Sequence, residues 1–133
     1  MSVVDEEIYT HLTNTTGLTA LTTQIWPYDP PQGAPWPLVT YSKVSGDREH
    51  AMGNDPNVTH SMFEFRVEAD DPLECRNVSV QVMAAMDRWT LTTGGVAVQE
   101  TLRQYEFAGV DYVGADDRKV YFNEIGFMIH HGE

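Results

Sequence analysis

Basic residues and cysteine are scarce in this sequence, and long apolar runs are missing from it. Eight Lys and Arg residues stand against 20 Asp and Glu residues, which gives a formal net charge of −12 at pH 7. A chain with so few cations lacks the basic patch that binds duplex DNA or an anionic membrane surface, so both functions are excluded. No apolar stretch approaches the ~18 residues of a membrane-spanning helix.

Cys75 is the only cysteine, which excludes an intramolecular disulfide and a cysteine-based zinc site. The first seven residues are acidic where a secretory signal would be basic and then apolar. We therefore expect a soluble protein that is made in a cytoplasm. Its 133 residues, 41% of them hydrophobic, suit one folded domain spanning residues 1–133.

The hydrophobic pattern predicts an α+β fold with a sheet of about four strands, mainly antiparallel. One long helix packs on this sheet, and a short helix precedes it at the N-terminus. The expected elements in chain order are a helix from Ser2 to Leu12, strands at 38–44 and 61–69, the long helix from Pro72, and strands at 96–107 and 119–130.

The strongest local signals lie in the middle of the chain. Between Ser61 and Ala69 apolar and charged residues alternate, which predicts a strand with one dry face and one face that is wet or covered by a partner. Asp70-Asp71-Pro72 then predicts a helix start, because Asp caps helices and Pro is tolerated in the first turn. A stripe at helical spacing follows, made of Cys75, Val78, Val82, Met86 and Trp89.

Three segments are expected to be irregular. Residues 26–37 hold five prolines, which restrain the backbone and remove hydrogen-bond donors. Residues 46–60 and 108–118 are polar and rich in turn-forming residues, and we expect both to be long loops. Long loops in a compact domain are often functional or mobile.

No set of residues predicts catalysis, a cofactor or a metal ion. His130 and His131 are adjacent on an expected strand and so point to opposite faces, while His11, His50 and His60 lack metal-ligand spacing. Asp70-Asp71 is explained by helix capping and Asp116-Asp117 by a turn. Cys75 lies on the apolar stripe and is expected to be buried and inert. Serine-hydrolase, phosphate-binding and dinucleotide motifs are all missing, so we expect no enzyme.

Several short stretches carry a resemblance to a known family. They are Leu18-Thr19-Ala20-Leu21, Ile25-Trp26-Pro27, Pro37-Leu38-Val39-Thr40-Tyr41 with the Ser45-Gly46 turn after it, and Gly94-Gly95-Val96. In this order, around one long helix, they resemble the tail-completion family of long-tailed bacteriophages and prophages, also described as tail terminators or tail-to-head joining proteins. The resemblance covers nearly the whole chain, and the Pro-Leu-Val-Thr-Tyr strand is its most specific part.

The resemblance implies a structural virion protein without catalytic residues. Such a protein forms a ring, typically a homo-hexamer, at the head-proximal end of the tail tube after assembly in the host cytoplasm. It stops tube growth and joins the tail to the head connector, so its partners are itself, the tail-tube protein and a connector or stopper protein. DNA would pass through its lumen, and the acidic composition suits a wall that repels phosphate.

The predicted assembly interface is the start of the first long loop, at Asp47, Arg48, Glu49 and His50. Two other functions stay open on the residues alone. One is a different neck or tail-tube component of a phage. The other is a small-molecule-binding or enzymatic α+β domain with a site between helix and sheet, because small α+β folds host many functions.

Overall fold

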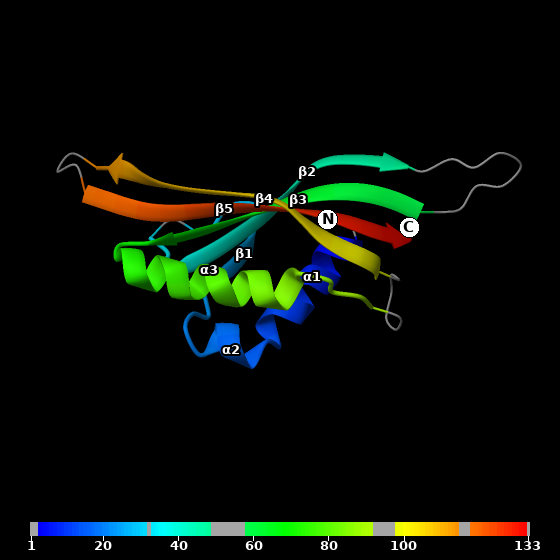
Figure 1. The fold of residues 1–133 in the computed structure, drawn as a ribbon. Coiled ribbons are helices and arrows are strands. Elements are labelled where there is room, and N and C mark those ends of the chain that lie inside the picture. The colour runs from blue at the N-terminus through cyan, green and yellow to red at the C-terminus, as the bar shows by residue number, and fades with distance from the viewer. Residues whose placement is uncertain (1–2, 32, 49–57, 92–97, 115–117, 133) are drawn as a thin grey trace, which may run out of the picture.

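One five-stranded sheet with helices on one of its faces makes up the fold in the computed structural model (Figure 1), which describes residues 3–31, 33–48, 58–91, 98–114 and 118–132. The strands are β1 (Ile25–Pro27), β2 (Leu38–Arg48), β3 (Val58–Ala69), β4 (Val98–Val113) and β5 (Arg118–Gly132), in the spatial order β1-β2-β3-β5-β4. The helices are α1 (Val3–Thr13), α2 (Thr16–Thr19) and α3 (Pro72–Met86).

The predicted α+β class is confirmed, but the expected count of about four strands is wrong. The additional strand is β1, which pairs in parallel with β2 through Ile25 opposite Val39 and Pro27 opposite Tyr41. The other strand pairs are antiparallel, so the sheet is mixed. We did not predict β1 from the sequence because this strand has only three residues, ends in proline and lies at the start of the stretch that we expected to be irregular. A proline is acceptable there because β1 lies at the edge of the sheet.

Two of the expected loops are shorter than predicted because the flanking strands continue into them. β2 runs to Arg48 and β3 starts at Val58, and β4 runs to Val113, six residues beyond the predicted end. Pairing explains the extension of β4, since Ala108 to Val113 lie opposite Asn123 to Arg118 of β5. The polar residues of these extensions lie on paired strands rather than in loops.

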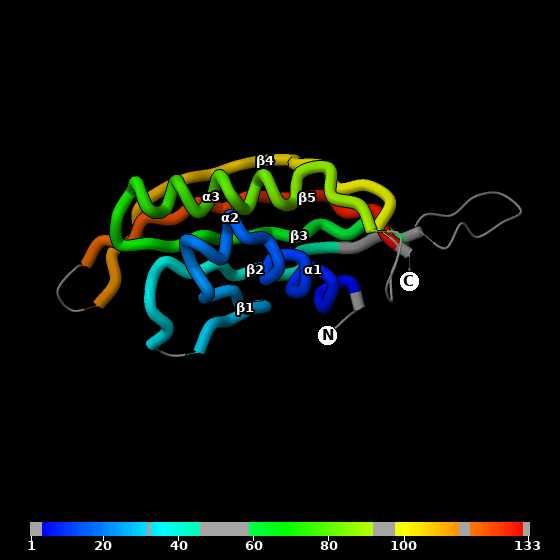
Figure 2. The backbone as a smooth tube through the Cα atoms, turned by 90° about the horizontal axis from the view of Figure 1, so that it is seen from below, coloured from blue at the N-terminus to red at the C-terminus, as the bar shows by residue number. Residues whose placement is uncertain are grey.

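The long helix α3 begins as the sequence predicts. Asp71 is its N-cap, and the Asp71 carboxylate accepts a hydrogen bond of 3.0 Å from the backbone N–H of Glu74, with Pro72 in the first turn. The predicted stripe is buried from Cys75 to Met86, while Trp89, also buried, lies beyond the end of the helix. The helix packs on β3 and β5, as Figure 2 shows from below.

The N-terminal helix α1 joins the same core. Val4, Ile8 and Leu12 are buried, as their spacing of four predicts. His11 lies against the far end of α3, with its Nε2 atom 2.7 Å from the carbonyl oxygen of Ala85 and its ring stacked on Trp89 at 4.7 Å. Among the described residues no helix has the length and apolar character needed to cross a membrane.

Replacing Asp71 with Ala should remove the cap of α3. Because the backbone N–H of Glu74 then loses its acceptor, we expect the free energy of unfolding to fall by about 1 kcal/mol. Urea unfolding followed by circular dichroism measures this change. Asp29→Ala, at an exposed aspartate outside the helices, is the control and should stay within about 0.5 kcal/mol of the native chain. Equal losses in both variants would contradict a capping role.

Candidate assembly surfaces

The sheet has one face without helices, and its side chains form the first candidate surface. On β3, Phe63, Phe65 and Val67 point to the helices and are fully buried. Their neighbours point to the opposite side, which we call the open face. The open face includes Glu64, Arg66 and Glu68 of β3, Phe122, Glu124, Gly126 and His130 of β5, and Glu100, Tyr105, Phe107 and Asp111 of β4.

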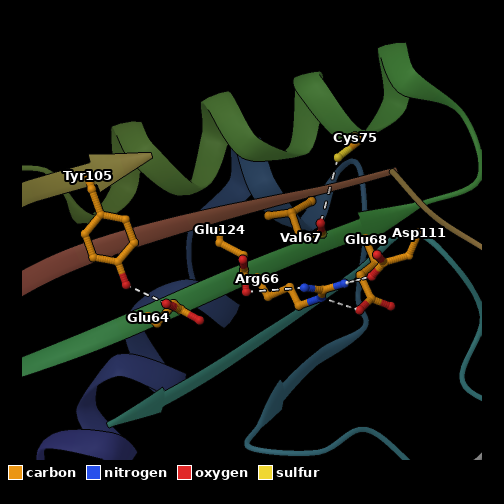
Figure 3. Close-up of polar contacts among 8 residues, drawn as sticks. All are labelled: Glu64, Arg66, Val67, Glu68, Cys75, Tyr105, Asp111 and Glu124. Atoms are coloured by element: carbon orange, nitrogen blue, oxygen red, sulfur yellow. Dashed lines mark hydrogen bonds and ion pairs between the residues drawn. The ribbon is translucent and has the colours of Figure 1, made fainter. Parts of the chain in front are cut away.

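Arg66 holds the three strands of the open face together (Figure 3). Its guanidinium lies 2.6 Å from Glu68 on the same strand, 3.2 Å from Glu124 on β5 and 2.8 Å from Asp111 on β4. It also stacks over the ring of Phe122, 4.2 Å from the ring centre. Burial lowers the pKa of Arg66, but its hydrogen bonds to Glu68 and Asp111 outweigh burial and raise the pKa above its ordinary value. Three carboxylates therefore share one permanent cation.

A second link across the open face runs from β4 to β3 over a glycine. The Tyr105 hydroxyl donates a hydrogen bond to Glu64, and its ring passes over Gly126 of β5, which lies directly opposite Tyr105. A Cβ atom at Gly126 would collide with the Tyr105 ring. Glycine is thus required at 126 so that an aromatic side chain can cross the middle strand.

A similar arrangement occurs four residues along the strands, with the aromatic ring on β5 and the glycine on β4. Phe122 of β5 lies opposite Gly109 of β4, where an added Cβ would come within 2.7 Å of the Phe122 ring. Phe107 packs beside Phe122 with ring centres 6.0 Å apart. Because Phe107 remains 59% exposed, this end of the open face presents an aromatic surface.

The two adjacent histidines point to opposite faces, as predicted. His130 lies on the open face, stacked on His60 at 4.1 Å and 4.0 Å from Glu100. His131 is buried on the helix side, where its Nε2 atom lies 2.8 Å from the Ser61 hydroxyl. Within the described residues no three His, Cys, Asp or Glu side chains come together as metal ligands. His50 lies outside the described part of the chain.

The other described residues considered for catalysis make contacts that stabilise the fold. Asp70 pairs with Arg118 at 3.2 Å, Asp71 caps α3, and Asp116-Asp117 lie outside the described residues. Cys75 is buried with its sulfur 3.8 Å from the carbonyl oxygen of Val67. Burial raises the pKa of the Cys75 thiol, which keeps it protonated and unreactive.

A groove of about 390 Å³ lies between α3 and the strands β4 and β5. Its walls are mostly apolar and include Cys75, Val80 and Met83 of the helix. Its carboxylate, Glu106, accepts a 2.7 Å hydrogen bond from the Asn123 amide. Glu106 is thus already bound within its own chain, and Cys75 is the buried thiol described above.

Two of the four predicted interface residues lie in the part of the chain that the structure describes. Asp47 and Arg48 do not begin a loop but lie in β2, opposite His60 and Thr59 of β3, because the strand pairing continues past the Ser45-Gly46 turn signal. Glu49 and His50 lie outside the described residues. The sequence did not reveal the crossings by Tyr105 and Phe122 over glycines, and the signal that could have found them is the pair Gly109 and Gly126 in two otherwise regular strands.

A solved structure has the same architecture. It is a chain of a particle described as "Virion of native gene transfer agent (GTA) particle", with a TM-score of 0.64 over 95% of this chain and 92% of that one. The sequences are 17% identical, so this likeness shows the fold. Nothing among the curated proteins matches the chain.

The family profile of "Tail completion protein gp17" matches residues 6–120, which is most of the chain. The chain therefore belongs to this tail-completion family, as the resemblance predicted, and is a structural component of a phage-type tail.

Gly126→Ala should destabilise the fold because the new methyl group displaces Tyr105 from its place over β5. We expect the free energy of unfolding to fall by about 1–3 kcal/mol, the usual range for overpacking. Urea unfolding of Gly126→Ala, Tyr105→Ala and the double variant tests the cause. If the two residues interact, the double variant loses less than the sum of the single losses, whereas simple addition would contradict the crossing.

Tyr105 should make the free energy of unfolding depend on pH in the alkaline range. Burial, then the hydrogen bond to Glu64 and the nearby carboxylates, raises the pKa of Tyr105 from 10.0 to about 12. The unfolded chain releases this proton first, so the free energy of unfolding falls as pH rises from about 10 to about 12. Tyr105→Phe should reduce that fall, measured by urea unfolding across this range. Tyr112→Phe, at an exposed tyrosine on the same strand, should leave it unchanged, and equal effects would contradict the assignment.

Proposed function

We propose that this chain, acting as one domain, forms a ring at the head-proximal end of a phage tail tube. The ring, of six copies as is typical for such proteins, stops growth of the tube and offers a surface to the head connector. Membership of the tail-completion family is the observation that carries this proposal. In this view the subunits meet during assembly in the host cytoplasm, and the partners are a second copy, the tube protein and a connector or stopper protein.

The charge of the chain supports a role around a DNA channel. The net charge is −12, and the open face carries five carboxylates, from Glu64, Glu68, Glu100, Asp111 and Glu124, of which three contact Arg66. An acidic wall repels DNA phosphates, so the nucleic acid slides past without binding. Specific recognition of DNA would require the reverse charge.

Growth of tail tubes in the presence of the chain tests the proposal. Purified tube protein polymerises with and without the chain, and electron microscopy gives the distribution of tube lengths. A terminator shortens the tubes and appears at one end only. Incorporation along the whole tube would show a tube component instead, and unchanged tubes without bound chain would overturn the proposal.

We also propose that the segment from Asp47 to His50 contacts a partner during assembly. Replacing Asp47, Arg48, Glu49 and His50 with Ser and Gly should lower the fraction of capped tubes at least tenfold, because charged contacts at the end of β2 are lost. Ser substitutions at exposed Glu6, Asp29 and Arg76 are the control for the change in charge. Full capping by the fourfold variant would remove this segment from the interface.

A further inference from the structure

The two edges of the sheet differ in how they are protected against pairing with another strand. Exposed edges usually carry short strands, proline or lysine, which prevent unwanted pairing. β1 follows this rule, because it has three residues and ends at Pro27. β4 does not follow it, because it has 16 residues and lies at the other edge.

Only the first part of β4 is covered on its outer side. Leu91 forms an antiparallel bridge with Val98, and the backbone N–H of Arg88 donates to the carbonyl oxygen of Thr101 at 2.9 Å. From Leu102 to Val113 no strand of the described chain pairs with the outer edge. A strand rises about 3.4 Å per residue, so the outer edge of β4 is without a pairing strand over about 40 Å.

The side chains of this free edge favour pairing. The stretch from Tyr105 to Val113 contains neither proline nor lysine, and the bulge between Arg103 and Tyr105 ends before it. Phe107 is 59% and Tyr112 62% exposed, and aromatic and β-branched residues are favoured between paired strands. The two acidic residues of the stretch, Glu106 and Asp111, are bound by Asn123 and Arg66 of their own chain.

A second uncovered edge lies on the opposite side of the same molecule. β1 covers β2 only from Val39 to Tyr41, so among the described residues Ser42 to Arg48 have no neighbouring strand on that side. Lys43 and Val44 are exposed there, Val44 by 58% at the bulge between Lys43 and Ser45. Lys43 and the bulge guard this edge against unspecific pairing, so a partner strand has to offer a matching negative charge. The uncovered part of β2, residues 42–48, contains Lys43, Arg48 and Asp47, a formal charge of +1. The free edge of β4, residues 102–113, contains Arg103, Glu106 and Asp111, a formal charge of −1.

We propose that the free edge of β4 (residues 102–113) pairs with the uncovered edge of β2 (residues 42–48) in a second copy of this chain. The two edges differ and lie on opposite sides of the sheet. Each copy can therefore pair its β4 edge with one neighbour and its β2 edge with the other, as a closed ring requires. Opposite charges favour this pairing over two β4 edges meeting, which matters in a chain of net charge −12. The inference rests on the proposed ring and adds the surface that builds it.

Cross-linking between two variants tests the pairing directly. Val110→Cys places a thiol on β4 and Val44→Cys places one on β2, both at exposed positions. Cys75 is 5% exposed, so the unmodified chain with the same bis-maleimide reagent is the background. A mixture of the two variants should yield cross-linked dimers, and a chain with both substitutions a ladder of larger species. Dimers from Val110→Cys alone, or no product above background, would overturn the proposal.

Charge placed on the free edge tests the same contact without a reagent. Phe107→Lys combined with Tyr112→Lys should weaken self-association at least tenfold in light scattering across a concentration series. Leu73→Lys, at a 61% exposed position on α3, is the control and should leave association unchanged. Circular dichroism should show all variants folded, because these side chains are exposed in the single chain.

The two proposals fail separately. A ring that persists in the Phe107→Lys, Tyr112→Lys variant and gives no cross-link between positions 44 and 110 overturns the edge pairing and leaves the terminator role standing. A cross-linked ring that does not stop tube growth supports the edge pairing and overturns the terminator role. A chain that stays monomeric at every concentration, without the cross-link, also overturns the edge pairing.

Discussion

Burial of one side of β3 under the helices is the constraint on which the remaining structure depends. Phe63, Phe65 and Val67 are fully buried against the helical layer, and each large apolar side chain contributes about 1.5–3 kcal/mol when removed from water. A slip by one residue would place Glu64 and Arg66 in that core, so the register of β3 is fixed. Since β3 is the central strand, β2 and β5 inherit this register and β4 follows from β5.

The opposite face of the sheet shows what the fixed register makes possible. Arg66 meets carboxylates from three strands, and Tyr105 reaches Glu64 across Gly126, only because each partner stands at a defined place along its strand. These contacts lock the strands to one another without a covering layer. The face remains acidic, which suits the DNA channel that we propose for this protein of the tail-completion family.

Sequence patterns predicted the parts of the fold whose signals are local. The cap at Asp71 and the alternation of β3 depend on neighbouring residues, and both are confirmed. β1 and the long end of β4 depend on pairing with distant strands, which periodicity does not reveal. The surface contacts of Arg66 join residues up to 58 positions apart and were equally hidden. The interface predicted at Asp47 to His50 remains a prediction, because the described structure holds no partner.

The end of the hairpin formed by β4 and β5 has a mechanical consequence. From Val110 onward the apolar side chains of β4 are exposed on both sides, Val110 and Tyr112 toward the helix side and Val113 toward the open face, while Val120 of β5 is buried. No helix supports this part of the sheet, which extends past α3 (Figure 1) and is one layer thick. Because few of its side chains are buried, we expect this end of the hairpin to open at a lower free energy than the strands over the core. The rigid sheet over the core thus ends in a more flexible hairpin, which can change its angle when it contacts a partner.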